Sequence, residues 1–420
     1  MHKHFGTNLV TLAVVIALLA MAVPLGFACA GTPPRGKRYV VVGYLGDFTG
    51  TASAALVPMV YAIEDLARYI NEEDPIPRIG LRTIAFDTKL DPRRDITGYN
   101  WSRDKGAELI ITPLPTTAEA LKETFAKADK VPVISLAATL PQIEPPGWVF
   151  CTNPPASYQA KALLKWVSEE HWDYEGTGRK PKIGTVGYTV PYDEEIYQGI
   201  LEYCQARQDQ LQWVGGFLMP MGTMTWSDEA EALRDCDYVC LPSIGEAAAT
   251  FIKEFRDKGF MATFIGLDYV AIYQGLAVDE CGWDYLDGML TAHSTLWWDE
   301  SAPLVDLAKD LLSRYHPLDN DYDSDVEEIM HTGSAYLSGF QQAYLFFDLV
   351  RAAVKEVGVK NFDGQSFYEV ATGFQATYEG LPEWGFTEMR RYASRHVAIY
   401  EWSAEVEGLV RITDWLPVVD

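Results

Sequence analysis

Residues 39–54 read YVVVGYLGDFTGTASA. The first part, Tyr39–Leu45, is apolar on both faces, a pattern typical of a central strand in a parallel sheet. A loop of glycine, threonine and alanine follows, and a helical pattern then continues to about Asn71. This order predicts that the stretch begins an α/β domain whose first loop approaches a ligand.

Strand and helix patterns alternate along the rest of the chain. A first group of strands is expected at 39–45, 81–87, 108–112 and 131–135, and a second group at 182–188, 213–218, 237–242 and 263–268. Helical patterns separate them, so the chain contains two successive sets of βαβ units. The sequence therefore predicts an α/β protein with two doubly wound parallel-sheet lobes. After about residue 287 the pattern becomes mostly helical, and a last strand comes at 396–402.

The two groups of strands define the expected lobes. The first lobe comprises residues 39–153 and 287–379, and the second comprises residues 154–286 and 380–420. The chain then passes between the lobes three times, near Asn153, Asp287 and Gly380. We expect these three crossovers to form a hinge.

An apolar segment precedes the lobes. Residues 9–28 read LVTLAVVIALLAMAVPLGFA, without a charge. The pattern predicts an export signal within residues 1–30, followed by a linker at residues 31–38. Three interpretations of its end stay open: cleavage by ordinary signal peptidase, lipidation of Cys29 after the lipobox-like Gly26-Phe27-Ala28, or an uncleaved anchor. Each of them places residues 39–420 outside the cytoplasm, in a periplasm or on the outer face of the cytoplasmic membrane.

Composition and motifs exclude several classes of function. The formal net charge of −25 argues against nucleic acid or an anionic lipid surface as a partner. The glycines at 43, 46 and 50 do not fit the spacing GxGxxG, so we expect turns there rather than a dinucleotide site. No GxSxG, HExxH or P-loop motif is present, so we expect neither an enzyme nor a cofactor.

No metal site is expected either. The cysteines after Cys29 are odd in number, so they cannot all pair, and none has zinc-ligand spacing with histidines nearby. The acidic run at 319–328 begins like a calcium loop, but Ser324 stands at the sixth place and Met330 at the twelfth. We therefore expect buried thiols, with one disulfide left open, and a solvated acidic loop. The cysteines concerned are Cys151, Cys204, Cys236, Cys240 and Cys281.

The loops after the strands are the expected binding site, because ligands sit at the carboxyl ends of parallel strands. The loops of the first lobe offer hydroxyls and backbone N–H groups beside helix starts, which suits a carboxylate or another small polar group. The loops of the second lobe offer aromatic and acidic side chains, so the pair of lobes suits a zwitterion. The candidate ligand contacts are Thr49, Thr51 and Thr116 in the first lobe, and Tyr192, Ser243 and Asp268 in the second.

Three of these residues have a second interpretation. Thr116 and Glu119 form a capping-box signature at a helix start. Asp268 equally fits a turn at a strand end, and Tyr192 equally fits packing beneath a loop.

The chain resembles the type I periplasmic solute-binding proteins of the branched-chain amino acid (leucine/isoleucine/valine) class, which are receptors of ABC importers. The resemblance spans about residues 39–415 and implies the type I fold of two lobes joined by a three-strand hinge. The sequence departs from the family pattern at TPLPTT (112–117), with its second proline, and at PSIGE (242–246), which lacks a tyrosine. The matching segments are VVVGYLGDFTGTASA, YAIEDLARYINEE, LRTIAFDTKLDP, ELIITPLPTTAEA, VPVISLAATLPQ, FCTNPPASYQAKAL, KIGTVGYTVPYDEEIYQGI and TFIGLD.

The resemblance also assigns roles to individual residues. By this resemblance Thr116 matches a hydroxyl position, and Ala137 and Thr139 match the loop that holds the ligand carboxylate. Tyr192 matches an aromatic lining position, and Asp268 matches the acid that meets the ligand ammonium.

Together these features predict an extracytoplasmic solute-binding receptor of an ABC importer. It captures a small polar solute, an amino acid in the first place and an amide-like molecule in the second, in a cleft that closes about the hinge. Its partners are the solute, the permease subunits and, if Cys29 is lipidated, the membrane. The alternative is a ligand-sensing component of a signalling system on the same fold; an exported hydrolase is a more distant one.

Overall fold

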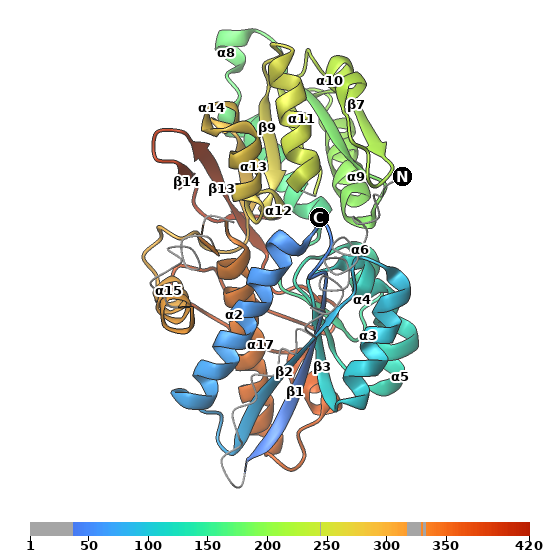
Figure 1. Ribbon diagram of the computed structural model, residues 1–420. Coiled ribbons are helices and arrows are strands. Elements are labelled where there is room, and N and C mark those ends of the chain that lie inside the picture. Colours follow the sequence, from blue (N-terminus) through green and yellow to red (C-terminus); the bar gives the residue numbers. More distant parts are fainter. Residues whose placement is uncertain (1–36, 244, 317–328, 331–332) are drawn as a thin grey trace, which may run out of the picture. The chain divides into compact units, whose positions relative to one another are not determined.

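The computed structural model describes residues 37–420, apart from 244, 317–328 and 331–332 (Figure 1). The expected export signal, Cys29 and the acidic run at 319–328 lie outside the described residues. Among the helices that are described, none is long and apolar enough to cross a membrane.

The first sheet has five parallel strands in the order β2-β1-β3-β4-β5, so the apolar stretch at Tyr39–Leu45 is one of its inner strands. Val40 and Val42 of β1 contribute to the hydrophobic cluster on one face, and Val41 and Leu45 contribute to the cluster on the other. This confirms the strand that is apolar on both faces. The strands are β1 (Arg38–Gly46), β2 (Ile79–Asp87), β3 (Ala107–Thr112), β4 (Val133–Ser135) and β5 (Val149–Cys151).

Helices cover both faces of this sheet. Helices α2 and α17 lie side by side on one face (Figure 1), where Gly339 approaches Met59 so closely that a Cβ would lie 3.1 Å from its Cα. Helices α3 and α4 pack on the other face. The helices of this lobe are α2 (Ser53–Glu72), α3 (Pro92–Asp104), α4 (Pro115–Leu121), a π-helical turn (Lys122–Ala126), α5 (Lys127–Asp129), α6 (Leu140–Ile143), α15 (Pro303–Tyr315), α17 (Ala335–Val357) and α18 (Gly364–Ala371).

The second sheet follows the order β14-β13-β10-β9-β8-β6-β7, and β15 also pairs with β13. Its strands from β6 to β10 are parallel, whereas β13 runs antiparallel to both β10 and β14. The strands are β6 (Lys182–Tyr188), β7 (Gln212–Met219), β8 (Tyr238–Cys240), β9 (Thr263–Leu267), β10 (Leu290–His293), β13 (His396–Ser403), β14 (Gly408–Arg411) and β15 (Leu416–Pro417).

The helices of the second lobe include α9, which packs on β6 and β7, and α11, which appears between β9 and β7 in Figure 1. They are α7 (Ala156–Trp166), a π-helical turn (Val167–His171), α8 (Tyr174–Thr177), α9 (Pro191–Ala206), α10 (Ser227–Ala232), α11 (Gly245–Asp257), α12 (Asp268–Ala271), α13 (Gln274–Cys281) and α14 (Trp283–Leu286). The five described cysteines, from Cys151 onward, are free thiols.

Three segments connect the two sheets, and they lie next to one another. Ser394 N donates to the carbonyl of Thr152 at 3.0 Å, and Ser294 Oγ donates to Asn153 Oδ1 at 2.8 Å. The second and third connections come later in the chain than we expected from the sequence, because β10 still belongs to the second sheet and Phe386 still packs on Phe150 of the first lobe. We propose these three connections as the hinge, and the proposed lobe boundaries move to them.

Several short strands were missed in the sequence, β5 and β10 among them. We had placed β5 in a crossover and β10 in a mostly helical region. Each is only three or four residues long, too short to show a periodic pattern. A two-stranded piece, β11 (Gln375–Ala376) with β12 (Trp384–Gly385), adds to the first lobe, where Tyr378 Oη donates to Asp348 of α17 at 3.1 Å.

Candidate functional site

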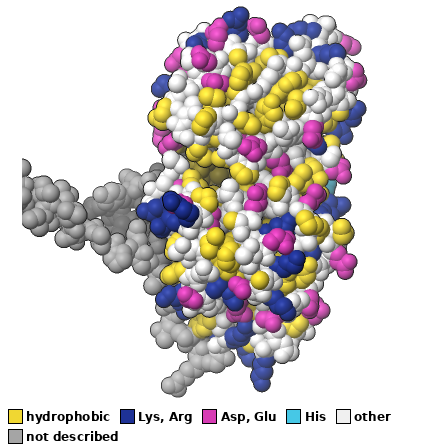
Figure 2. Space-filling view, turned by 90° about the vertical axis from the view of Figure 1, so that its right-hand side faces the viewer, with side chains coloured by type: hydrophobic (Ala, Val, Ile, Leu, Met, Phe, Trp, Pro, Cys, Tyr) yellow, Lys and Arg dark blue, Asp and Glu magenta, His cyan; other side chains and the backbone are white. Residues whose placement is uncertain are grey.

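The carboxyl ends of the strands in both sheets lead to the same interlobe region, and several hydrogen bonds cross it. Leu140 N, at the start of α6, donates to Glu195 Oε2 of α9 at 2.6 Å. Ser334 N, before α17, donates to the carbonyl of Ala271 in α12 at 3.1 Å. A space-filling view shows a hollow lined by hydrophobic side chains at mid-height on one face (Figure 2). The two lobes are therefore in contact along a polar seam.

Asp268 follows β9 directly and begins α12. Its carboxylate accepts a hydrogen bond from Asn153 Nδ2, which lies on the first connection between the lobes. The side chain is buried, and this burial raises the pKa of its carboxyl to about 7, against the lowering effect of bonds from the Tyr269 backbone and Asn153. A buried carboxylate without a cationic partner is costly, which is why burial favours the protonated form of Asp268.

Tyr192 lies in the first turn of α9, close to Asp268. Its ring meets that of Tyr269 edge to face, with 5.7 Å between centroids. Burial raises the pKa of Tyr192 well above its usual value, and Asp268, Glu195 and Asp193 raise it further. Its hydroxyl is buried without a hydrogen-bond partner among the described residues, a situation that folded proteins rarely leave unresolved.

Thr139 lies at the end of the loop after β4, as the family pattern implies, but its hydroxyl is already engaged. Thr139 Oγ1 donates to Glu119 Oε1 of α4 at 2.7 Å, and the side chain is 1% exposed. The carbonyl of Ala137, in the same loop, accepts from Ser135 Oγ at 2.6 Å. Both positions lie in the loop that leads to Leu140 and the interlobe region. The Thr139 hydroxyl and the Ala137 carbonyl are each bonded to a side chain of the first lobe.

The capping box expected for Thr116 and Glu119 is wrong. Helix α4 begins at Pro115, so Leu114 takes the N-cap position and makes no side-chain cap, and Thr116 lies inside the first turn. Proline fixes the start because its missing N–H and set φ suit the first helical position. Leu114 N is instead held by Thr112 Oγ1 at 3.1 Å.

The remaining candidates lie in the loop after β1 and in the loop after β8. Thr49 is exposed and donates to Asp87 Oδ2 at 2.8 Å, and Thr51 is exposed beside it. Ser243 N donates to Asp193 Oδ1 at 3.0 Å, in the loop after β8.

Several residues at the site were missed in the sequence. Glu195 accepts from Leu140 N and from the backbone and hydroxyl of Ser157, so it joins three elements. Asp193 accepts from Tyr188 N at 2.6 Å and from the Ser243 backbone. Asp193 lies in the first turn of α9 and Glu195 comes just after it. Acids are common near helix starts because they interact favourably with the helix dipole, so the sequence did not single these two out.

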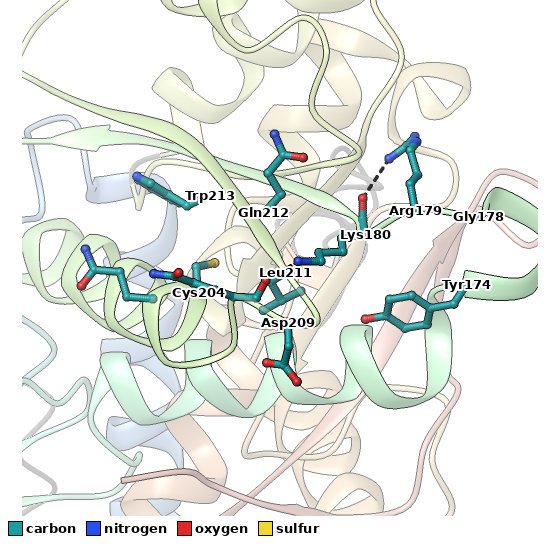
Figure 3. Close-up of a pocket in the computed structure, with 11 residues that line it drawn as sticks. Tyr174, Gly178, Arg179, Lys180, Cys204, Asp209, Leu211, Gln212 and Trp213 are labelled. Atoms are coloured by element: carbon teal, nitrogen blue, oxygen red, sulfur yellow. Dashed lines mark hydrogen bonds between the residues drawn. The ribbon is translucent and has the colours of Figure 1, made fainter.

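A separate cavity of about 940 Å³ lies in the second lobe, at the amino end of β7 (Figure 3). Arg179 and Trp213 line it from opposite sides of the view. The Arg179 guanidinium is already paired with Asp237, with Nη2 2.7 Å from Oδ1, and the Lys180 ammonium donates to the Gln208 carbonyl. The cavity therefore lies at the opposite strand ends from the interlobe region, and its cations are bonded.

Comparison with protein families gives one match, to the model described as periplasmic binding protein, over residues 40–406. The chain belongs to the periplasmic binding protein family. Curated proteins give no match. Membership implies an extracytoplasmic location, and the family and its solved neighbours are solute-binding proteins.

Solved structures of the periplasmic binding fold share the architecture at low identity. A branched-chain amino acid ABC transporter protein from Thermus thermophilus, with bound valine, is 18% identical, with a TM-score of 0.76 over 90% of this chain and 97% of that one. A solute-binding protein from Rhodopseudomonas palustris HaA2, in complex with p-hydroxybenzoic acid, is 12% identical, with a TM-score of 0.73 over 90% and 97%. A possible leucine/isoleucine/valine-binding protein from Rhodopirellula baltica is 16% identical, with a TM-score of 0.71 over 91% and 98%. This confirms the expected two-lobed α/β fold.

Proposed function

We propose that the protein is the solute-binding receptor of an ABC importer, and that it captures a small polar solute with an amino group between its lobes. The observation that carries this proposal is the group of buried polar side chains contributed by both lobes. Asp268, Asn153 and Tyr192 stand at its centre. A solute that donates hydrogen bonds would satisfy the Tyr192 hydroxyl and give Asp268 a counter-charge.

Hinge closure is the proposed mechanism. Hydrogen bonds such as that from Leu140 N to Glu195 join helix α6 of the first lobe directly to helix α9 of the second. The connections that would bend are few and adjacent, at Thr152, Ser294 and Ser394. Opening at these segments would separate the lobes and admit the solute, and closing would exclude water from it. The closed form is the one that the permease would recognise.

A ligand screen tests the proposal. The purified protein is heated with amino acids, amines, amides, urea and aromatic acids, and unfolding is followed by calorimetry. A ligand at a hundred times its Kd stabilises the folded state by about 2.7 kcal/mol, which is readily measured. A solute that raises the unfolding temperature, and loses that effect in Asp268→Asn, supports capture at this site. If no small solute stabilises the protein, the proposed function is wrong.

Membrane attachment through Cys29 is a separate part of the proposal, and it rests on the sequence alone. The small residues Gly26-Phe27-Ala28 before Cys29 and the polar linker after it favour lipidation. Cys29→Ser should release the protein from the membrane fraction with its fold unchanged. Retention that is unaltered, without acyl mass on Cys29, would reject the lipid anchor.

A further inference from the structure

Four carboxyl groups gather in the interlobe region. Asp193, Glu195 and Asp268 come from the second lobe and are 3%, 9% and 7% exposed, and Glu119 comes from the first lobe. Burial raises the pKa of both the Glu195 and the Glu119 carboxyl. The charge of Glu119 raises that of Glu195 further, and the charge of Glu194 raises that of Glu119. Within the described part of the chain, none of the four forms an ion pair with lysine, arginine or histidine.

The nearest cation of the first lobe is engaged elsewhere. Lys122 lies close enough to Glu119 to lower the pKa of that carboxyl. Its ammonium donates to the carbonyls of Pro141 and Glu144, at 3.0 and 2.8 Å, beneath helix α6. Lys122 is itself 6% exposed, so it is not positioned to meet an anionic ligand.

Two donors that could hold a ligand carboxylate, at the end of the loop after β4, are also engaged by the protein. At the end of the loop after β4, Thr139 Oγ1 donates to Glu119, and Leu140 N donates to Glu195. A ligand carboxylate at this loop would have to displace these side chains and remain beside both of them. Like charges at such distances repel strongly in a buried site.

Two buried tyrosine hydroxyls between the lobes have no hydrogen-bond partner among the described residues, and that of Tyr192 lies near these acids. Tyr192 is 8% exposed, and Asp268, Glu195 and Asp193 all act on it electrostatically. Tyr44, at the end of β1, is 1% exposed and close to Tyr273 of the other lobe. A hydroxyl oxygen can accept from an ammonium group, and aromatic rings attract a cation electrostatically.

We propose that the solute of this site is a small organic amine or ammonium ion that has no carboxylate group. This inference rests on the proposed function and narrows it. The carboxylates of both lobes supply the countercharge, the unpartnered tyrosine hydroxyls supply acceptors, and the loop donors that a carboxylate requires are bonded to Glu119 and Glu195. The net charge of −25 also favours the approach of cations.

Matched sets of compounds test the inference, because each set differs only in its charged groups. One set is leucine, 3-methylbutylamine and 4-methylpentanoate; a second is tyrosine, tyramine and 3-(4-hydroxyphenyl)propionate. Titration calorimetry at pH 8 measures the Kd of each. We expect at least one amine to bind ten times or more tightly than its parent amino acid, and neither carboxylic acid to bind.

Either of two results would overturn the amine inference. If an amino acid or acid binds more tightly than the matched amine, the amine inference is wrong, while solute capture stands. If no member of either set binds, the inference is also wrong, and the broad screen described above decides separately whether the protein captures a solute at all.

A variant adds a second test. Glu195→Gln keeps a side-chain oxygen to accept from Leu140 N and removes the charge. We expect the affinity for the amine to fall about tenfold. The affinity for the amino acid should fall less than this, or rise. An equal effect on both ligands would mean that Glu195 only supports the loop, and would count against the inference. Glu202→Gln, on the outer face of the same helix and paired with Lys161, is the matched control, with no change expected.

Discussion

The outer cavity of the second lobe and the interlobe region differ in whether their polar groups already have hydrogen-bond or ion-pair partners. The cavity encloses about 940 Å³ and is lined by charged residues, yet Arg179 is paired with Asp237 and Lys180 is bonded to a carbonyl. The interlobe region has carboxyls without cations and tyrosine hydroxyls without partners in the described chain. Open space alone therefore does not mark the binding site. We place the proposed site at buried polar groups that lack partners, because such a group carries a penalty of about 1–3 kcal/mol that a ligand relieves by bonding to it.

The charge of Asp268 is expected to have the largest effect. Asp268→Asn keeps the shape and removes the charge, so a bound amine would be left buried without a counter-charge. Breaking a buried pair in this way is worth about 3 kcal/mol or more, so we expect the Kd to rise by about a hundredfold or more in calorimetry. Asp209→Asn, a carboxylate at the outer cavity, should leave the Kd unchanged. Equal effects from the two variants would remove the distinction between the regions.

Binding of the amine should depend on pH through the same group. Burial raises the pKa of Asp268 to about 7, so its carboxyl takes up a proton as the pH falls below 7. We expect the affinity to fall by about fiftyfold between pH 7 and pH 5, as the ionised fraction falls. Titration across this range checks it, and Asp268→Asn should show a flat profile.

The unliganded protein should show the opposite trend in stability. The folded state holds the Asp268 proton more tightly than the unfolded chain does, because the pKa is raised from 3.8 to about 7. The stabilising contribution of this group is therefore complete below about pH 4 and is lost as the pH rises through 7. Chemical denaturation of wild type and Asp268→Asn at pH 5 and pH 8 measures it. A difference between the two proteins that does not change with pH would contradict the raised pKa.

A pair of tyrosine variants should separate binding from stability. The Tyr192 hydroxyl has no partner among the described residues, whereas Tyr269 Oη donates to the Leu241 carbonyl at 2.6 Å. Tyr192→Phe should weaken ligand binding by about tenfold and leave the free energy of unfolding nearly unchanged. Tyr269→Phe should lower that free energy by about 1 kcal/mol, because a buried carbonyl loses its donor. If Tyr192→Phe destabilises the unliganded protein instead, its hydroxyl is structural.

The smallest effect is expected at the outer cavity. Arg179→Ala removes an ion pair with Asp237 that is partly exposed. Such pairs contribute about 0–1 kcal/mol, so the unfolding midpoint should move little, and the Kd of the solute should stay within about twofold of wild type. A large loss of affinity in this variant would show that the cavity takes part in binding.

The sequence by itself determined the order of strands and helices, and with it the two-lobed α/β fold. Continuous apolar runs such as Tyr39–Leu45 are long enough to be recognised directly, because a strand buried on both faces carries few polar residues. The strand-end rule also pointed to Asp268 and Tyr192, since ligands bind at the carboxyl ends of parallel strands. Short strands such as β5 and β10 gave no such pattern.

Only the tertiary structure decided which side chains meet. Asn153 and Asp268 are 115 residues apart, and Leu140 and Glu195 are 55 apart; no local pattern encodes either contact. Thr139 stands where the family pattern implies a carboxylate-binding hydroxyl, yet the fold directs that hydroxyl to Glu119. The physical reason is that the hydrogen-bond partner of a side chain is set by the packing of separate elements, whereas the element itself is set by its own hydrophobic periodicity.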